Sequence, residues 1–271
     1  MSATSQADVS GPERGGLAAN YRPRPGTIDE MVGADGLVKP AWRPLLDHLD
    51  GLTRSGIDSG FARADRYLRD AGVYYRAYGD GGSDAREWPL AHVPLLIEES
   101  EWRGIAAGLV QRARLLEQVI ADIYGDNRLV AEGLLPPQLI AGSPEYLRPV
   151  AGWAPREHFL HFLAFELGRG PDGRWWVLCD RTQAPSGAGF ALENRVATGR
   201  AFSDLLNTMN VHRLAGFFRD LRDALFRLSG QPEGGVAILT PGQHNETYFE
   251  HAYIARYLGL MLLEGADLTI A

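Results

Sequence analysis

Hydrophobic residues recur at helical spacing through the first half of the chain. Apolar positions three and four residues apart predict a helix over Pro40–Thr53 and a second, shorter one over Ser59–Ala71. The longest apolar stripe follows Ser100, a candidate N-cap, and ends at Gly125. A further short helix is predicted to begin at Pro137, because proline is favoured in the first helical turn. The pattern therefore predicts a helical N-terminal region.

Strand-like segments appear in the middle of the chain. Val73–Tyr78 is a short β-like run that a glycine-rich turn ends. Two aromatic and aliphatic runs, His158–Leu167 and Arg174–Asp180, are joined by a second glycine-rich turn. Such an arrangement predicts a β-hairpin.

The predicted hairpin brings polar side chains together. We assume that Arg169 pairs with Arg174 across the turn. Alternate residues of a strand share a face, so Glu166, Cys179 and Arg181 then lie close to one another. A one-residue slip of the register would separate them. Two interpretations stay open, a functional cluster and a cross-strand Glu–Arg ion pair beside a core cysteine.

The last part of the chain reads as helices followed by a strand–helix–strand unit. Residues 202–209 and 211–228 have helical patterns. Val236–Leu239, Glu246–Leu258 and Leu260–Glu264 then predict a strand, a helix and a parallel strand. Two such strands do not form a stable layer alone. Either they pair with the hairpin, or the sequence is the N-terminal piece of a longer protein, which we favour. The fold class predicted is α/β.

Composition narrows the class of protein. Of the 271 residues, 45% are hydrophobic, which is enough for a packed core and excludes wholesale disorder. Met1–Gly26 is polar, has no apolar signal segment and is predicted to be a disordered tail. The net charge of −7 argues against nucleic-acid partners. No apolar run is long enough for a membrane helix, so no membrane partner is expected.

Single residues exclude further chemistries. Cys179 is the only cysteine, so no internal disulfide forms, and a cytoplasmic location is expected. Lys39 is the only lysine and lies outside any P-loop motif, so P-loop and Schiff-base chemistry are nearly excluded. His158 and His161 would point to opposite faces of a strand, which argues against zinc.

Two polar stretches carry the remaining candidate chemistry. In Asp180–Arg195, Ser186 and Gly187 offer a hydroxyl and backbone N–H groups to phosphate, and Arg181 and Arg195 offer guanidinium groups. An ordinary surface loop is the alternative. Leu239–His251 is a glycine-bearing loop after a strand, where α/β folds bind ligands. In it, Asn245 is a candidate N-cap.

At these positions the sequence resembles the circularly permuted type 2 ATP-grasp family, relatives of glutathionylspermidine synthetase. The motifs follow the family's order from about Thr27 onward. They are Asp29-Glu30-Met31, Tyr78-Gly79-Asp80, Glu101-Trp102, Gln111-Arg112, Asp122-Ile123-Tyr124-Gly125, Asp180–Arg195, Leu239–His251 and Glu264-Gly265-Ala266-Asp267-Leu268.

The resemblance implies a domain organisation. Residues 1–26 would be the tail, and 27–230 a helical region with a hairpin-centred half of an ATP-grasp domain, of α+β character. Residues 231–271 would begin a Rossmann-like substrate domain. Family members are longer than this chain and resume after the last motif.

The resemblance also implies an activity, the ATP- and magnesium-dependent ligation of a small-molecule or peptide carboxylate to an amine through an acyl phosphate. Arg181 and Arg195 would then be catalytic, and Ser186 and Gly187 would hold phosphate together with Arg181. Asn245 and Glu250 would orient substrate. Because lysines of the nucleotide site would lie in the missing part, we expect these 271 residues alone to bind ATP weakly or not at all.

The metal site departs from the commoner family pattern. Glu166 fills the acidic position on the first hairpin strand, but Cys179 stands where the second strand usually has Glu, and Arg181 where it has Asn. Magnesium prefers hard oxygen ligands, so Glu166 is the residual metal ligand expected. A catalytically degenerate ATP-grasp scaffold or binding module is therefore the alternative function. The oligomeric state is unknown from the sequence.

Overall fold

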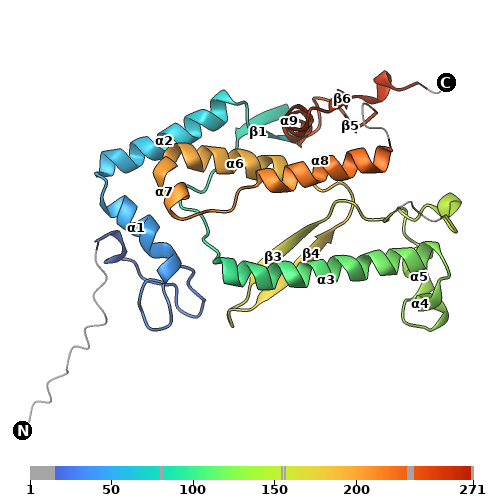
Figure 1. Cartoon of the computed structure of the whole chain (residues 1–271), viewed down its shortest axis with the longest axis horizontal. Helices are drawn as coiled ribbons and strands as arrows, with labels where there is room; N and C mark the ends of the chain where they lie inside the picture. Colours follow the sequence, from blue (N-terminus) through green and yellow to red (C-terminus); the bar gives the residue numbers. More distant parts are fainter. Residues whose placement is uncertain (1–15, 80–81, 154, 156, 231–234, 270–271) are drawn as a thin grey trace, which may run out of the picture. The chain divides into compact units, whose positions relative to one another are not determined.

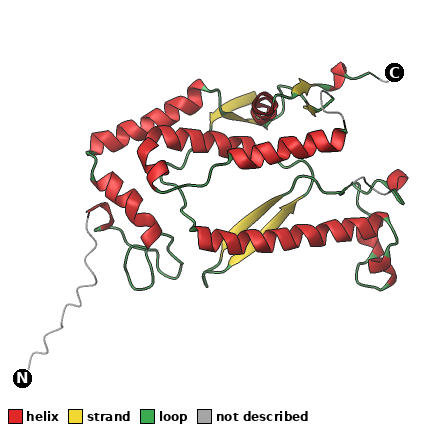
Figure 2. Cartoon of the chain, in the orientation of Figure 1, coloured by secondary structure: helices red, strands yellow, loops and turns green. Residues whose placement is uncertain are grey.

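The structure, a computed structural model, describes residues 16–79, 82–153, 155, 157–230 and 235–269. It divides into two compact units. Unit 1 consists of Met1–Leu96 and Ser186–Ala271, and unit 2 of Ile97–Pro185. Helices make up most of the regular structure, with short strands between them (Figures 1 and 2). The predicted α/β class with α+β character is confirmed.

Unit 1 begins with two predicted helices. They are α1 (Arg43–Asp50) and α2 (Arg54–Asp70), and the Thr53 hydroxyl caps α2 by accepting from the Gly56 N–H at 3.1 Å. Leu45 and Leu49 on α1 are buried in one core cluster. The short 3₁₀ helices η1 (Gly16–Ala18) and η2 (Pro40–Trp42) precede them.

The predicted N-terminal tail lies partly outside the described residues. Residues 1–15 are not described, whereas the Leu17 N–H donates to the Asp50 carboxylate at 2.7 Å. Ala18 is buried. Within 16–26, therefore, at least one turn packs against the helical region.

The central helix of unit 1 is α6 (Ala188–Ala201). The sequence interpretation of Asp180–Arg195 as a loop is therefore wrong for residues 188–195. The helix packs against α2 on one side and against α9 (Tyr248–Leu258) on another (Figure 1). A helix that is buried on several sides has no single apolar stripe. The periodicity that reveals a surface helix is absent from α6 for this reason.

Helices α7 (Ser203–Thr208) and α8 (Ala215–Ser229) follow, close to the predicted ranges. Phe202 and Leu205 join the core cluster of α1, and Phe218 is almost fully buried beside Tyr253.

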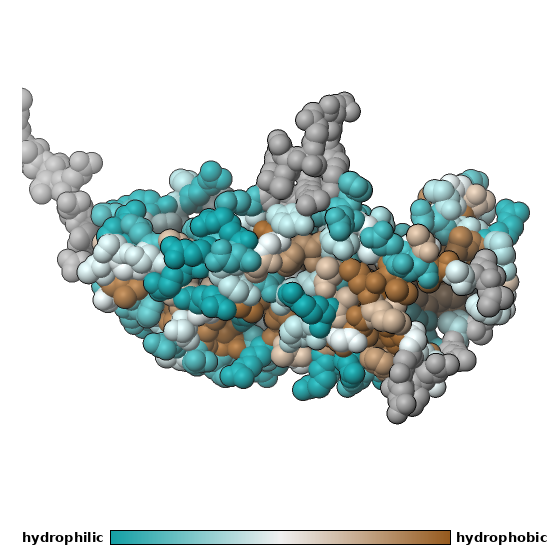
Figure 3. Space-filling view, turned by 90° about the horizontal axis from the view of Figure 1, so that it is seen from above, coloured by the Kyte–Doolittle hydropathy of each residue, from teal (hydrophilic) through white to brown (hydrophobic). Residues whose placement is uncertain are grey.

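The predicted strand–helix–strand unit is confirmed. Strands β5 (Ala237–Leu239) and β6 (Met261–Leu263) pair in parallel, with Ile238 opposite Leu262, and α9 connects them. Gly259 ends α9 in the left-handed conformation that favours glycine. The 3₁₀ helix η4 (Gly265–Asp267) follows β6. Apolar side chains interrupt the hydrophilic surface in the view from above (Figure 3). Leu239, Tyr257 and Met261, in β5, α9 and β6, are exposed apolar residues.

Unit 1 also contains a β-hairpin, of which the sequence predicted only the first strand. Strand β1 (Tyr74–Gly79) matches the predicted run, and it pairs with β2 (Gly82–Glu87), which the sequence did not predict. The segment Gly82–Glu87 is polar and lacks the β-branched residues typical of strands.

Unit 2 combines one long helix with the predicted hairpin. The helix α3 (Glu99–Tyr124) begins after Glu98, so Ser100 is not its N-cap. Two short helices, α4 (Arg128–Ala131) and α5 (Pro137–Ala141), and the 3₁₀ helix η3 (Arg148–Val150) follow. The hairpin consists of β3 (Ala164–Arg169) and β4 (Trp175–Arg181).

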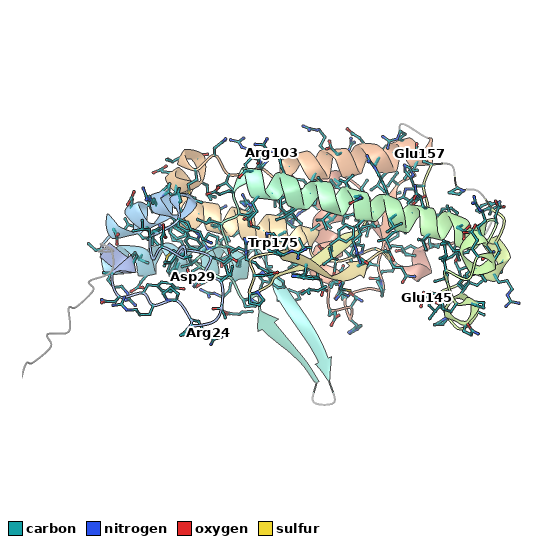
Figure 4. All side chains as sticks on the ribbon, turned by 90° about the horizontal axis from the view of Figure 1, so that it is seen from below. Arg24, Asp29, Arg103, Glu145, Glu157 and Trp175 are labelled. Atoms are coloured by element: carbon teal, nitrogen blue, oxygen red, sulfur yellow. The ribbon has the colours of Figure 1, made fainter. Side chains whose placement is uncertain are left out.

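A partly buried cluster of polar side chains connects the hairpin to α3. Glu101 on α3 accepts from the Arg169 guanidinium at 2.6 Å and from the Trp175 indole N–H at 3.0 Å. Trp175 lies among the side chains of this unit in Figure 4. At the other end of the unit, Glu117 accepts from the backbone N–H groups of Phe159 and Leu160, which lie before β3 rather than in it.

Candidate functional site

The hairpin register differs from the one assumed. Arg169 pairs with Trp175 instead of Arg174, because the Gly170 N–H closes the turn on the Arg174 carbonyl at 2.8 Å. A β-bulge after Glu166 shifts the register again. The two shifts place Glu166 directly opposite Cys179.

The predicted cluster on one face of the hairpin nevertheless forms. Arg181 donates to Glu166 Oε1 from Nε at 2.7 Å and from Nη2 as well. Glu166 holds the pKa of Arg181 above its usual range. Both side chains are about half exposed, so this pair contributes little to stability.

The neighbouring carboxylate is also neutralised by an arginine. Arg112 on α3 binds Asp180 through two hydrogen bonds of 2.6 and 2.7 Å. The Arg112 guanidinium keeps the pKa of Asp180 below its usual range. Sequence reasoning assigned Arg112 no role, because its partner lies 68 residues away along the chain.

The donor set on the hairpin does not fit a magnesium ion. Each of the two carboxylates is engaged by a guanidinium, and the third position holds the thiol of Cys179. The described part of the chain contains no group of three or more His, Cys, Asp or Glu side chains that could hold a metal. We therefore derive no step of the chemistry through magnesium. The role of Glu166 as a metal ligand stays a prediction, and the guanidinium groups bound to Glu166 and Asp180 argue against it.

The candidate phosphate-binding residues stand at the start of α6. Gly187, with φ +124°, precedes the helix, and Ser186 is exposed before it. The Gly187 N–H donates to both carboxylate oxygens of Glu250, at 2.7 and 2.8 Å. The Gly189 N–H donates to Glu250 Oε1 at 2.7 Å. The N-terminus of α6 thus already binds a carboxyl group of its own chain.

Glu250 is a buried carboxyl group with a defined electrostatic setting. Its side chain is only 2% exposed. Burial raises the pKa of Glu250, and the hydrogen bonds from Gly189 and Gly187 offset part of the rise. The structure therefore brings together Gly187 and Glu250, two residues that the sequence assigned to different roles.

Arg195 lies two turns further along α6, beside a cavity of about 400 Å³. The cavity wall is mostly apolar and comes from α1, α6, α7 and residues 90–96. Arg195 Nη1 donates to the His212 carbonyl at 3.0 Å. Eight residues of helix, about 12 Å along its axis, separate Arg195 from Gly187. The two residues thus stand at different places in unit 1.

Asn245 belongs to the loop between β5 and α9. Its side-chain oxygen accepts from the Thr247 N–H at 2.9 Å and from the Thr247 hydroxyl at 2.7 Å. Thr247 is the N-cap residue of α9, so the prediction that Asn245 occupies the cap is wrong by two positions. The hydroxyls of Thr240 and Thr247 contact the two ring nitrogens of His251, at 2.9 and 3.2 Å.

Sequence reasoning missed a buried carboxyl group on α6. Glu193 is 3% exposed and hydrogen-bonds to the hydroxyls of Tyr67 and Tyr253. Burial first, and Glu193 second, raise the pKa of Tyr67 to about 12 and raise that of Tyr253 as well. Reading α6 as a helix would have placed Glu193 on the same face as the apolar residues Phe190 and Ala197, three positions before it and four after it, and so marked it.

The candidate residues are divided between the two units. Glu166 and Arg181 belong to unit 2. Ser186, Gly187, Arg195, Asn245 and Glu250 belong to unit 1. Their roles as catalytic, phosphate-binding, substrate-binding and metal-binding residues stay predictions.

A family comparison covers both units. The pattern of the circularly permuted ATP-grasp type 2 family matches residues 94–271, which include the hairpin, α6 and the β5–α9–β6 unit. The chain belongs to this family. The expected resemblance is thereby confirmed.

Relatives of this ATP-grasp chain are much longer proteins. It is 36% identical over 265 residues to an uncharacterized protein of Mycobacterium tuberculosis, covering 93% of this chain and 30% of the relative. It is 32% identical over 271 residues to a Frankia casuarinae protein named "Putative glutamate–cysteine ligase 2-2", covering 99% and 31%. A Synechocystis protein is 32% identical over 246 residues, covering 90% and 51%. The chain thus spans about a third to a half of these relatives.

Among the residues described, none of the helices is both long and apolar enough to cross a membrane.

Proposed function

We infer that this ATP-grasp chain is part of an ATP-dependent ligase that joins a small-molecule or peptide carboxylate to an amine. Membership of the ATP-grasp family over residues 94–271 carries the inference. The names of two relatives from Frankia, which describe a ligase of glutamate and cysteine, support an amide-forming reaction. ATP is a cytoplasmic substrate, so we place the reaction in the cytoplasm.

The reaction has two balanced steps. An oxygen of the carboxylate substrate attacks the γ-phosphorus of ATP, and ADP leaves, which gives an acyl phosphate. The amine nitrogen then attacks the acyl carbon, phosphate leaves, and the nitrogen loses a proton. Charge develops on phosphate oxygens in both steps, so guanidinium groups stabilise the transition states.

Each candidate residue has a proposed role in these steps. Arg181 holds phosphate oxygens, and Arg195 holds the oxygens of the substrate carboxylate that becomes the acyl phosphate, because a bidentate guanidinium matches the geometry of both groups. The Ser186 hydroxyl and the Gly187 N–H bind phosphate at the start of α6. For the Gly187 N–H to do so, Glu250 has to release it. Asn245 and the released Glu250 then orient the substrate amine.

Trapping of the acyl phosphate tests the proposal. The protein as its gene encodes it is incubated with ATP, hydroxylamine and a panel of carboxylates, and ADP and acyl hydroxamate are measured. We expect hydroxamate from at least one carboxylate, and a loss of at least tenfold in Arg181→Ala. Arg103→Gln is the control, because Arg103 is an exposed arginine of the same unit that pairs with Glu99 on its own helix. A folded protein that releases no ADP with any carboxylate contradicts the proposal.

A degenerate scaffold is the second candidate, favoured by the arginines that occupy both hairpin carboxylates. The double substitution Cys179→Glu and Arg181→Asn restores the commoner family pattern. Gain of magnesium-dependent turnover in this variant indicates a lapsed site. Loss of a turnover that the parent protein has indicates a working variant site, and this is the result we expect.

A further inference from the structure

The cavity beside α6 combines an apolar wall with a small polar group. Sixteen residues line it, and most of them are leucine or another apolar type, including Leu45, Leu90, Leu96, Leu205 and Met209. Its volume of about 400 Å³ is within the range of small-molecule pockets, about 300–1,000 Å³. All the lining residues belong to unit 1, so the cavity is defined within that unit.

Arg195 brings a positive charge to this wall without an acidic partner. Among the residues that the structure describes, Arg195 donates to the His212 carbonyl and forms no ion pair with a carboxylate. Burial lowers the pKa of Arg195, which is the direction expected when a cation loses water and gains no anion. A partly desolvated charge of this kind is costly unless an anion completes it.

Asn194, the preceding residue, adds a second donor to the cavity. The Trp88 indole N–H donates to the Asn194 side-chain oxygen at 2.7 Å. An indole can only donate, so this contact fixes which end of the amide is oxygen. Trp88 is itself held by stacking on Phe190, with ring centroids 4.2 Å apart. The Asn194 NH₂ group therefore remains for a ligand, and no described residue accepts from it.

We propose that this cavity binds a small acid whose carboxylate contacts Arg195 and Asn194 and whose apolar body lies against the leucines. A carboxylate accepts two parallel hydrogen bonds from a guanidinium, which a neutral ligand does not. The wall has one cation, so it does not match a nucleotide triphosphate, which requires several. The assignment of this acid as the carboxylate reactant rests on the proposed ligase function, whereas its binding rests on the cavity alone.

Calorimetry with the full chain in the absence of ATP tests the binding. Octanoate is the probe, and octanamide is the matched neutral ligand of the same length. We expect octanoate to bind at least tenfold more tightly than octanamide, because one charge-assisted contact distinguishes them. Octyl phosphate tests whether the site prefers a phosphate head group. N-acetyl-leucylphenylalanine tests whether it prefers the carboxyl terminus of a peptide to a fatty acid.

Two variants locate the binding site, and one controls for charge. Arg195→Gln removes the cation, and we expect octanoate affinity to fall at least tenfold. Ala191→Trp places a large side chain at an exposed lining position, and we expect binding of every probe to be lost. Arg219→Gln, at an exposed arginine outside the lining, leaves affinity unchanged. Circular dichroism melting verifies that each variant folds.

The outcomes distinguish a failure of this binding proposal from a failure of the proposed ligase function. No octanoate binding, equal binding of octanoate and octanamide, preference for octyl phosphate, or binding that survives both cavity variants overturns it. Tighter binding of the acetylated dipeptide than of octanoate, with the same loss in Arg195→Gln, supports the site and identifies the acid as a peptide terminus. Octanoate binding without any hydroxamate formation leaves the cavity assigned and removes the ligase function.

Discussion

At the scale of single residues, Glu250 shows how a buried carboxyl group organises this protein. It receives three hydrogen bonds from the backbone N–H groups of Gly187 and Gly189, which lie 63 and 61 residues earlier in the sequence. The contact joins α9 to the start of α6. No local sequence pattern contains such a pair, so the sequence alone did not predict it.

The raised pKa of Glu250 makes stability depend on pH. The folded state holds this proton more tightly than the unfolded chain, in which the pKa is near its ordinary value of 4.5. As pH rises above 4.5, the unfolded state ionises first and gains relative stability, so the contribution of the protonated group is lost. We therefore expect the free energy of unfolding of the parent, minus that of Glu250→Gln, to fall as pH rises above 4.5.

Urea unfolding at several pH values measures this difference. Glu132→Gln, at the exposed C-cap residue of α4, is the control and should show no comparable slope. A difference that grows with pH would mean that the amide hydrogen bonds outweigh the burial of the charge.

At the scale of elements, the sequence predicted the elements whose apolar residues form a local pattern and missed the helix that is buried on more than one side. The hairpin β3–β4 and the β5–α9–β6 unit were predicted because glycine turns separate short apolar runs. Helix α6 was missed because it buries Phe190 and Ala197 in one core cluster and Leu192 in another. The register of β3–β4 was one residue out from the turn onward, because Gly170 rather than Arg169 bonds to Arg174, and the bulge after Glu166 shifts it by one more.

Two glycines test the difference between a packed helix and an exposed one. In α6, a Cβ on Gly189 would lie 2.9 Å from Glu250 Cγ, so Gly189→Ala should lower the free energy of unfolding by about 1–3 kcal/mol. In α3, a Cβ on Gly108 would meet no atom within 4 Å, so Gly108→Ala should raise it by about 0.5–1 kcal/mol. Chemical denaturation of both variants checks this. Equal effects of the two substitutions would show that α6 is not packed against Glu250.

At the scale of the whole molecule, the two units divide the candidate residues differently from the predicted regions. The sequence interpretation placed Asn245 and Glu250 in region 231–271 and the other candidates in region 27–230, whereas Ser186, Gly187 and Arg195 share unit 1 with Asn245 and Glu250. The predicted boundary at residue 230 lies inside unit 1, whose parts flank unit 2 in the sequence. Contacts between distant segments create this division, as when Trp88 reaches Asn194 across 106 residues. Periodicity is a local property and does not carry that information. The separation into tail, core and substrate domain therefore stays a prediction.

The interrupted sequence of unit 1 has a consequence for the order in which the chain acquires structure during synthesis. Unit 2 is continuous and is complete once Pro185 has left the ribosome, whereas α2 has to wait for α6 to cover it. Closing a loop of 106 residues costs about 4 kcal/mol of chain entropy, and this cost falls on unit 1. We expect pulsed hydrogen exchange during refolding to protect the β3–β4 amides before those of α6. The nascent chain would then expose the apolar face of α2 throughout the synthesis of unit 2, and apolar surface exposed in this way promotes aggregation.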